Sequence, residues 1–179
     1  MGFIRDFIKR KEYEIVNESN NAVKILDIKW ASFLKFDTYL IYDYKSLFLD
    51  LIKNCNKQTR IPWYFFWHIK LKSKLRSNLL KLNHYNSIIL NYNPNFVMKK
   101  KNEYRSLFNK GPLILDDDQQ TAIITDDKHN LVVAGAGSGK TEVLITRIAY
   151  LIKRTSDTIK PNRILALAFQ NKAANEMKK

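Results

Sequence analysis

Eight consecutive residues carry the strongest chemical signal in this chain. Residues 134–141 read Ala-Gly-Ala-Gly-Ser-Gly-Lys-Thr and follow the apolar run Leu131–Val133. Glycines permit a tight bend in which successive backbone N–H groups point at one polyphosphate. A lysine followed by a hydroxyl residue supplies a cation for the outer phosphates and an oxygen ligand for Mg²⁺. The spacing therefore predicts a nucleoside triphosphate site, with Lys140 and Thr141 in those two roles.

The loop departs at one position from the common pattern G-x-x-x-x-G-K-[ST], because its first residue is Ala134 rather than glycine. The alternative interpretation is a glycine-rich surface turn, which the coincidence of an apolar run, a loop, Lys-Thr and a helical pattern disfavours. The residues expected to cradle the phosphates are Ala134, Gly135, Ala136, Gly137, Ser138 and Gly139, together with Lys140 and Thr141.

The flanking residues predict the elements that must hold this loop. The β-branched run before it predicts a buried strand, and apolar residues at 144, 148, 151 and 152 recur at helical spacing. A helix starting at the loop would turn its positive dipole end toward the phosphates. A second apolar run, Ile164–Phe169, predicts another strand before a helix at 171–179. The expected fold is thus α/β, the start of a parallel-sheet nucleotide-binding domain that is incomplete here.

Charge divides the 179-residue chain into two parts. The net charge is +14, and residues 1–112 hold 21 Lys or Arg against 9 Asp or Glu, whereas residues 113–179 hold 10 against 8. We therefore expect a basic N-terminal accessory domain at 1–112 and an ATP-binding domain at 113–179, separated at Gly111-Pro112. The excess of cations favours a polyanion partner such as nucleic acid. The alternative is a lysine-rich composition spread over solvated faces.

The N-terminal domain is expected to be mostly helical, of α+β type. β-Branched and aromatic residues predict strands at 13–16, 23–28 and 38–42, whereas the other patterns predict helices at 2–11, 45–54, 62–90 and 95–109, with a break at 91–94. The aromatic cluster Trp63–Trp67 is expected to pack in the core. Its alternatives are a stacking surface for nucleic acid or an anchor at a membrane interface.

Other features exclude several classes of protein. A single cysteine, Cys55, rules out an intrachain disulfide and favours a reducing compartment. Charged residues interrupt the N-terminus, so no secretory signal is expected. No run of about 18 apolar residues exists, so no membrane span is expected. A soluble, cytoplasmic protein without membrane association is the expectation.

Three stretches resemble one family, the UvrD-like superfamily 1 DNA helicases. Residues 115–123 are similar to its Q motif, L-x-x-x-Q-x-x-A-[IV], and residues 134–141 match its motif I, including the leading alanine. Residues 168–177 resemble its motif Ia, from which Ala168 and Gln170 depart. The Ala-Phe opening and the lead-in at 93–119 are closer to the DNA helicase IV branch. The resemblance covers residues 93–179 and is weak over 1–92.

The resemblance implies an enzyme, an ATP-driven 3′-to-5′ translocase that separates DNA strands, with two RecA-like domains and ATP between them. Gln119 would bind adenine, whose edge a glutamine amide can match with its donor and its acceptor. The glycines and Lys140 would hold the phosphates, and Thr141 would ligate Mg²⁺. Single-stranded or partly duplex DNA would contact Phe169, Asn171 and Lys172. No protein partner is indicated.

Hydrolysis requires further groups, namely an acidic metal ligand, a residue that orients water and an arginine finger. Residues 142–179 offer no such acidic strand end. We therefore expect this chain to be the N-terminal part of a longer helicase, binding nucleotide and DNA only weakly by itself. The alternative is a stand-alone nucleic-acid-binding module with a vestigial loop.

Overall fold

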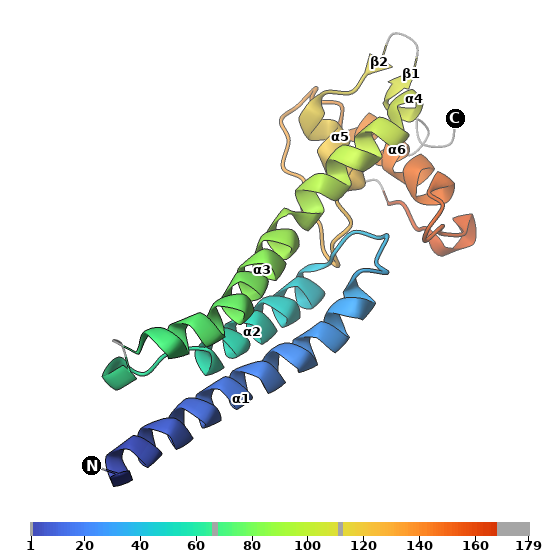
Figure 1. Cartoon of the computed structure of the whole chain (residues 1–179). Coiled ribbons are helices and arrows are strands. Elements are labelled where there is room, and N and C mark those ends of the chain that lie inside the picture. Colours follow the sequence, from blue (N-terminus) through green and yellow to red (C-terminus); the bar gives the residue numbers. More distant parts are fainter. Residues whose placement is uncertain (1, 66–67, 111–112, 168–179) are drawn as a thin grey trace. The chain divides into compact units, whose positions relative to one another are not determined.

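A computed structural model describes residues 2–65, 68–110 and 113–167. It contains two compact units (Figure 1). Unit 1 comprises Met1–Phe36 and Tyr42–Tyr92, and unit 2 comprises Asp37–Ile41 and Asn93–Lys179. These units are defined by packing and divide at residues 92 and 93. The expected boundary between two functional domains at residue 112 stays a prediction.

Unit 1 is an up-down-up arrangement of three helices. Helix α1 (Gly2–Phe33) and helix α2 (Tyr42–Gln58) run antiparallel, and the first part of α3 (Ile69–Glu103) runs beside them (Figure 1). A short 3-10 helix, η1 (Trp63–Phe65), precedes α3. The start of α1, the end of α2 and the start of α3 therefore lie at one end of this unit.

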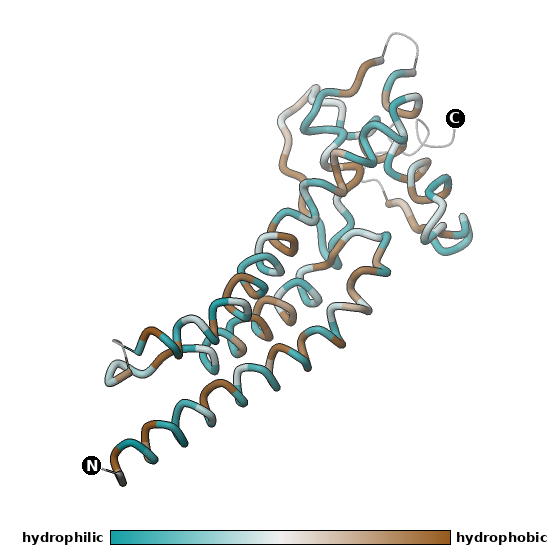
Figure 2. The backbone as a smooth tube through the Cα atoms, in the orientation of Figure 1, coloured by the Kyte–Doolittle hydropathy of each residue, from teal (hydrophilic) through white to brown (hydrophobic). Residues whose placement is uncertain are grey.

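The core of unit 1 follows helical spacing on all three helices. Apolar and polar stretches alternate along each helix (Figure 2), as expected for helices with one buried face. Trp30 stacks on Tyr85 with ring centroids 4.0 Å apart, and Phe33 meets Phe48 edge-on at 5.1 Å. The buried residues include Val23, Leu26, Trp30 and Phe33 of α1, Phe48, Ile52 and Cys55 of α2, and Leu71, Leu75, Leu82, Tyr85 and Ile89 of α3.

The strands expected within residues 12–44 are wrong. Residues 13–16 and 23–28 lie inside α1, and residues 38–42 form no strand. The buried positions 23, 26, 30 and 33 repeat every three to four residues, which is the period of a helix. Burial on that period outweighed the preference of Val, Ile and Tyr for strands.

The break expected at 91–94 is also wrong, because α3 continues through Pro94. Asn93 ties this part of α3 to Leu40 within unit 2. Its Nδ2 donates to the Leu40 carbonyl at 2.8 Å, and its Oδ1 accepts from the Leu40 N–H at 3.0 Å. Pro94 has no backbone N–H, so it cannot make the usual helical hydrogen bond. The two contacts of Asn93 with Leu40 hold α3 in place at this point.

Unit 2 contains the end of α3 and a series of short elements. Its core includes Phe108, Leu115, Ile123 and Ile124, all almost fully buried. The two strands pair antiparallel, with Asn109 opposite Ile114. The elements are α4 (Arg105–Phe108), β1 (Asn109–Lys110), β2 (Leu113–Ile114), α5 (Asp117–Ile124), α6 (Lys140–Lys153) and η2 (Pro161–Arg163).

The expected parallel sheet of an α/β domain is contradicted. Within the described residues, β1 and β2 are the whole of the sheet structure, and neither Leu131–Val133 nor residues 164–167 form a strand. Leu131 and Val133 are 89% and 87% exposed, and Leu165 is 82% exposed. A strand needs neighbours that bury its side chains and pair its backbone, and these runs have neither here.

None of the described helices combines the length and apolar character needed to cross a bilayer.

Candidate functional site

The glycine-rich loop bends sharply before α6. Gly137 and Gly139 both have φ of +75°, a left-handed conformation that favours glycine. Gly139 is the N-cap residue of α6, and the helix begins at Lys140. The expectation of a helix starting at the loop is confirmed. The first N–H groups of a helix lack partners within it, and here they lie at the end of the glycine turn.

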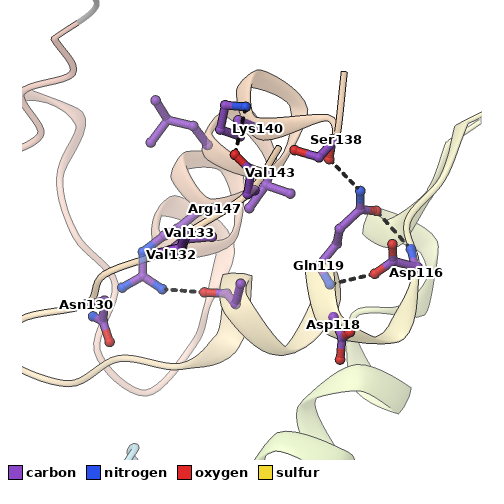
Figure 3. A pocket seen from close by; sticks show the side chains of 13 residues that line it. Asp116, Asp118, Gln119, Asn130, Val132, Val133, Ser138, Lys140, Val143 and Arg147 are labelled. Carbon is purple, nitrogen blue, oxygen red and sulfur yellow. Dashed lines mark hydrogen bonds between the residues drawn. The ribbon is translucent and has the colours of Figure 1, made fainter. Parts of the chain in front are cut away.

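Gln119 connects α5 to this loop. Its Nε2 donates to the Ser138 carbonyl at 3.1 Å, and its Oε1 accepts from the Asp116 N–H at 2.9 Å (Figure 3). The Asp116 carboxylate in turn accepts from the Gln119 N–H at 2.8 Å, which completes a capping box at the start of α5. The Gln119 side chain therefore takes part both in the cap of α5 and in the contact with the glycine-rich loop.

The Gln119 side chain lies close to the Cα atom of Gly139. A Cβ atom at that position would lie 3.2 Å from Gln119 Nε2. At Gly135, by contrast, a Cβ atom would meet nothing within 4 Å. The backbone angle therefore favours glycine at 139, and a Cβ atom there would also displace the Gln119 amide by a few tenths of an ångström.

The Lys140 side chain lies over the loop. Its Nζ donates to the carbonyls of Ala134 at 3.2 Å and Gly135 at 2.5 Å. Ser138 Oγ donates to the same Gly135 carbonyl at 2.8 Å. Because the lysine is exposed, its ammonium can exchange these carbonyls for phosphate oxygens at little desolvation cost.

A pocket of about 510 Å³ lies between the loop, α5 and α6 (Figure 3). Val132 and Val133 form part of an apolar wall, and Gln119, Lys140 and Arg147 bring polar groups to its edge. A mostly apolar pocket with a few convergent polar groups is the usual form of a small-molecule site. The pocket therefore joins the loop and Gln119, which lie 15 or more residues apart in sequence.

Arg147 lines this pocket. No motif in the sequence indicated a role for it. From α6 it reaches the end of α5, where Nη1 donates to the carbonyls of Ile123 at 2.8 Å and Thr125 at 2.6 Å. Its Nη2 pairs with Asp126 Oδ1 at 2.9 Å. A cation at the carboxyl end of a helix also meets a favourable dipole. Arg147 thus fixes α5, and with it Gln119, against α6.

The buried face of α6 continues this network. Thr146 and Tyr150 of α6 and its C-cap residue Arg154 are buried at four-residue spacing, whereas the apolar positions 144, 148, 151 and 152 are only partly buried. Arg154 pairs with the other oxygen of Asp126 and, through Nε, with Asp157 at 2.8 Å. Burial raises the pKa of Tyr150 to about 12. An arginine among apolar helix positions was the sequence signal that could have revealed Arg147 and Arg154.

The loop fits a triphosphate with Mg²⁺ by its conformation and its donor groups. The left-handed glycines, the N-terminus of α6 and the Lys140 ammonium are the groups that bind polyphosphates in proteins. Thr141, in the first turn of α6, offers the hydroxyl ligand for the metal. Within the described residues, no group of three His, Cys, Asp or Glu side chains forms an alternative metal site.

The three residues predicted to contact DNA, Phe169, Asn171 and Lys172, lie outside the described residues. Their roles stay predictions, as do the ligand roles of Gln119 and the loop.

Comparison with protein families defines the class of this segment. Residues 115–179 match the UvrD/REP helicase N-terminal domain. This segment is therefore similar to the UvrD-like helicases, and the predicted resemblance is confirmed. Its assignment to the helicase IV branch stays a prediction.

Curated relatives match a stretch of the chain of similar length. A probable DNA helicase II homolog of Mycoplasma capricolum is 54% identical over 65 residues, which are 36% of this chain and 9% of the relative. The ATP-dependent DNA helicase PcrA of Staphylococcus epidermidis is 48% identical over 64 residues, 36% of this chain and 8% of the relative. The match thus covers under a tenth of each relative's length. No solved structure matches this chain.

Proposed function

We propose that residues 113–179 form the nucleotide-binding front of an ATP-dependent DNA helicase. In the whole protein, ATP hydrolysis would drive 3′-to-5′ movement and strand separation, with DNA as the substrate. The loop 134–141 holds the triphosphate, Lys140 neutralises its outer phosphates, and Thr141 ligates Mg²⁺. The metal supplies charge neutralisation at the phosphates when it is bound. Residues 168–179 supply the first DNA contacts.

One observation carries the proposal. Gly137 and Gly139 are left-handed, and α6 begins directly after Gly139. The Gln119 side chain donates to the carbonyl of Ser138, which lies between these two glycines. A surface turn would not need the adenine-reading glutamine of the family pattern beside it. The resemblance in sequence and the geometry of the loop therefore support the same site.

Gln119 retains the groups needed to read adenine. A glutamine amide has two N–H donors and two oxygen lone pairs. One donor is used by Ser138 and one lone pair by Asp116. One N–H and one lone pair remain, the pair that the edge of adenine requires. The proposed role is thus compatible with the capping box that orients the side chain.

A pair of glycine substitutions tests this function. Gly139→Ala forces a Cβ into a left-handed conformation, which costs about 1–2 kcal/mol, and sets it against Gln119. We expect the variant loop to leave this conformation when it is free, so that binding of a fluorescent ATP analogue with Mg²⁺ must restore it and weakens about 10-fold, the equivalent of that energy. Gly135→Ala makes the same chemical change in open space and should retain binding.

The alternative function, a nucleic-acid-binding module with a vestigial loop, predicts a different result. The unaltered chain would then show no saturable binding of the analogue, and both alanine variants would behave like it. Equal loss in the two variants would also contradict the proposed geometry.

A further inference from the structure

The end of unit 1 where α1 and α3 begin is hollowed and basic. A groove of about 820 Å³ lies between the two helix starts, and Arg5, Lys9 and Lys70 contribute to its walls. A second hollow of about 520 Å³ lies beside it and is lined by Lys72 and Arg76. Ile69, the first residue of α3, lines both. We call these two hollows and the adjoining η1 the basic end.

Two carboxylates beside the basic end, Glu12 and Glu14, form ion pairs with cations that do not line its hollows. Glu12 accepts from Lys74 at 2.7 Å, and Glu14 is bonded to Arg10 and to Lys11 at 2.8 Å. Within the described residues, Arg5, Lys9, Lys70 and Arg76 form no ion pair, although Asp6 is exposed nearby. The end therefore presents a net positive surface to solvent.

The positive charges at the starts of α1 and α3 do not stabilise the fold. Neither α1 nor α3 has an acidic residue in its first turn, and α3 begins Ile-Lys-Leu-Lys. Cations near the positive end of a helix dipole are usually destabilising. A site that breaks this local rule without a compensating contact in the fold is a candidate for binding an anion.

Aromatic rings are exposed in η1, which lies in sequence between the lining residues Ile61 and His68. Trp63 is 82% exposed and Tyr64 is 47% exposed, and their rings lie edge to face at 5.9 Å. The third residue of η1, Phe65, is buried against Leu71 and Leu75 and anchors the turn. The predicted core packing of the aromatic cluster thus holds for Phe65 among the described residues. Trp63 and Tyr64 instead offer faces on which flat rings can stack.

We propose that the basic end binds single-stranded DNA, with phosphates along Arg5, Lys9, Lys70 and Arg76 and a base stacked on Trp63. A polyanion that also carries flat rings matches both features, and stacking tolerates any base sequence. The choice of DNA among single strands rests on the proposed helicase function. The site gives unit 1 a role that the nucleotide loop does not provide.

A charge-neutralising variant and a matched control test the proposal. The end variant combines Arg5→Gln, Lys9→Gln, Lys70→Gln and Arg76→Gln, and the control combines Lys24→Gln, Lys29→Gln, Lys35→Gln and Lys45→Gln. Both lose the same charge, but Lys24 lies about 22 Å along α1 from Lys9. Circular dichroism verifies that each variant is folded. Fluorescence anisotropy measures binding to an oligothymidylate of about 16 nucleotides without added nucleotide.

With four phosphate contacts, the affinity of the unaltered chain should fall about 50-fold between about 50 and about 200 mM salt. The end variant should bind at least about 10-fold more weakly at low salt and lose most of this salt dependence. The control variant should match the unaltered chain. Trp63→Ala should weaken binding roughly 10-fold at an unchanged salt slope, because stacking is not ionic.

Three results would overturn the proposal. The first is equal weakening in the end and control variants, because general charge would then suffice. The second is equal affinity for duplex DNA with no effect of Trp63→Ala. The third is binding to vesicles of phosphatidylcholine and phosphatidylserine in place of the oligonucleotide, because the surface would then face a membrane. Gly139→Ala should leave DNA binding unchanged, so failure of the nucleotide site is separable.

Discussion

Replacing Asp126 by alanine is expected to lower the free energy of unfolding by about 2–4 kcal/mol. Asp126 is the carboxylate shared by Arg147 of α6 and Arg154, the C-cap residue of that helix. The Arg154 side chain is only 8% exposed, so it would be left as a buried charge with Asp157 as its remaining anion. The effect stays below that of a fully buried pair because the Asp126 side chain is 26% exposed.

Asp118→Ala is the matched control for this change. Asp118 is exposed in the first turn of α5 and contributes mainly through the helix dipole, so its loss should cost under about 1 kcal/mol. Urea unfolding of both variants, followed by circular dichroism, measures the difference. Similar losses in the two variants would show that the arginine network does not hold α5 against α6.

Lys140→Ala is expected to weaken binding of Mg²⁺–ATP roughly 100-fold, which corresponds to about 2.7 kcal/mol. The ammonium is the one cation that the loop itself carries, and Arg147, another cation that lines the pocket, is already bonded to the end of α5 and to Asp126. Isothermal titration calorimetry with ATP and with tripolyphosphate measures the effect. The two ligands should lose similar affinity, because the lysine acts on phosphates and not on the base.

Lys153→Ala provides the control for overall charge. It removes a cation from the last turn of α6, about 20 Å from Lys140 along the helix. It should leave both affinities within about twofold of the unaltered chain, since exposed charges this far apart are screened. If the two variants were equally weakened, the lysine would act through general charge and not through the loop.

The site was largely predictable because its signal is local. A glycine turn, a lysine and a helix start are set by neighbouring residues, and Gly139 and Lys140 lie where the spacing places them. Gln119 was identified through a family pattern, and its contact with Ser138 crosses 19 positions of sequence. Spacing alone would have left it as a polar residue on a helix surface.

Arg147 and Tyr150 escaped prediction because their partners are distant in sequence. Arg147 bonds to groups more than 20 positions earlier, and Tyr150 is buried by packing that includes Tyr104, with ring centroids 5.1 Å apart. The apolar residues at 144, 148, 151 and 152 have helical spacing, but the buried stripe runs through Thr146, Tyr150 and Arg154. Periodicity locates a helix more reliably than it identifies the face that is buried.

The errors in the fold arose from short apolar runs. Val23–Ile28 is as suitable for a strand as for a helix by composition, and only its packing against α2 and α3 decides for the helix. Leu131–Val133 has strand-forming residues but no neighbour that covers them. Residue type indicates what a segment can become, whereas its partners determine what it does become.

The proposed function requires that the backbone N–H groups of the loop bind the triphosphate. Nuclear magnetic resonance of the uniformly ¹⁵N-labelled chain measures this directly, through the amide signals of Gly135, Gly137 and Gly139 during titration with Mg²⁺–ATP. We predict large downfield shifts of these glycine amides, which tripolyphosphate reproduces, together with a shift of the Gln119 side-chain amide for ATP alone. If the protein were saturated with ATP and the three glycine signals did not move, the loop amides would not be the groups that bind the triphosphate.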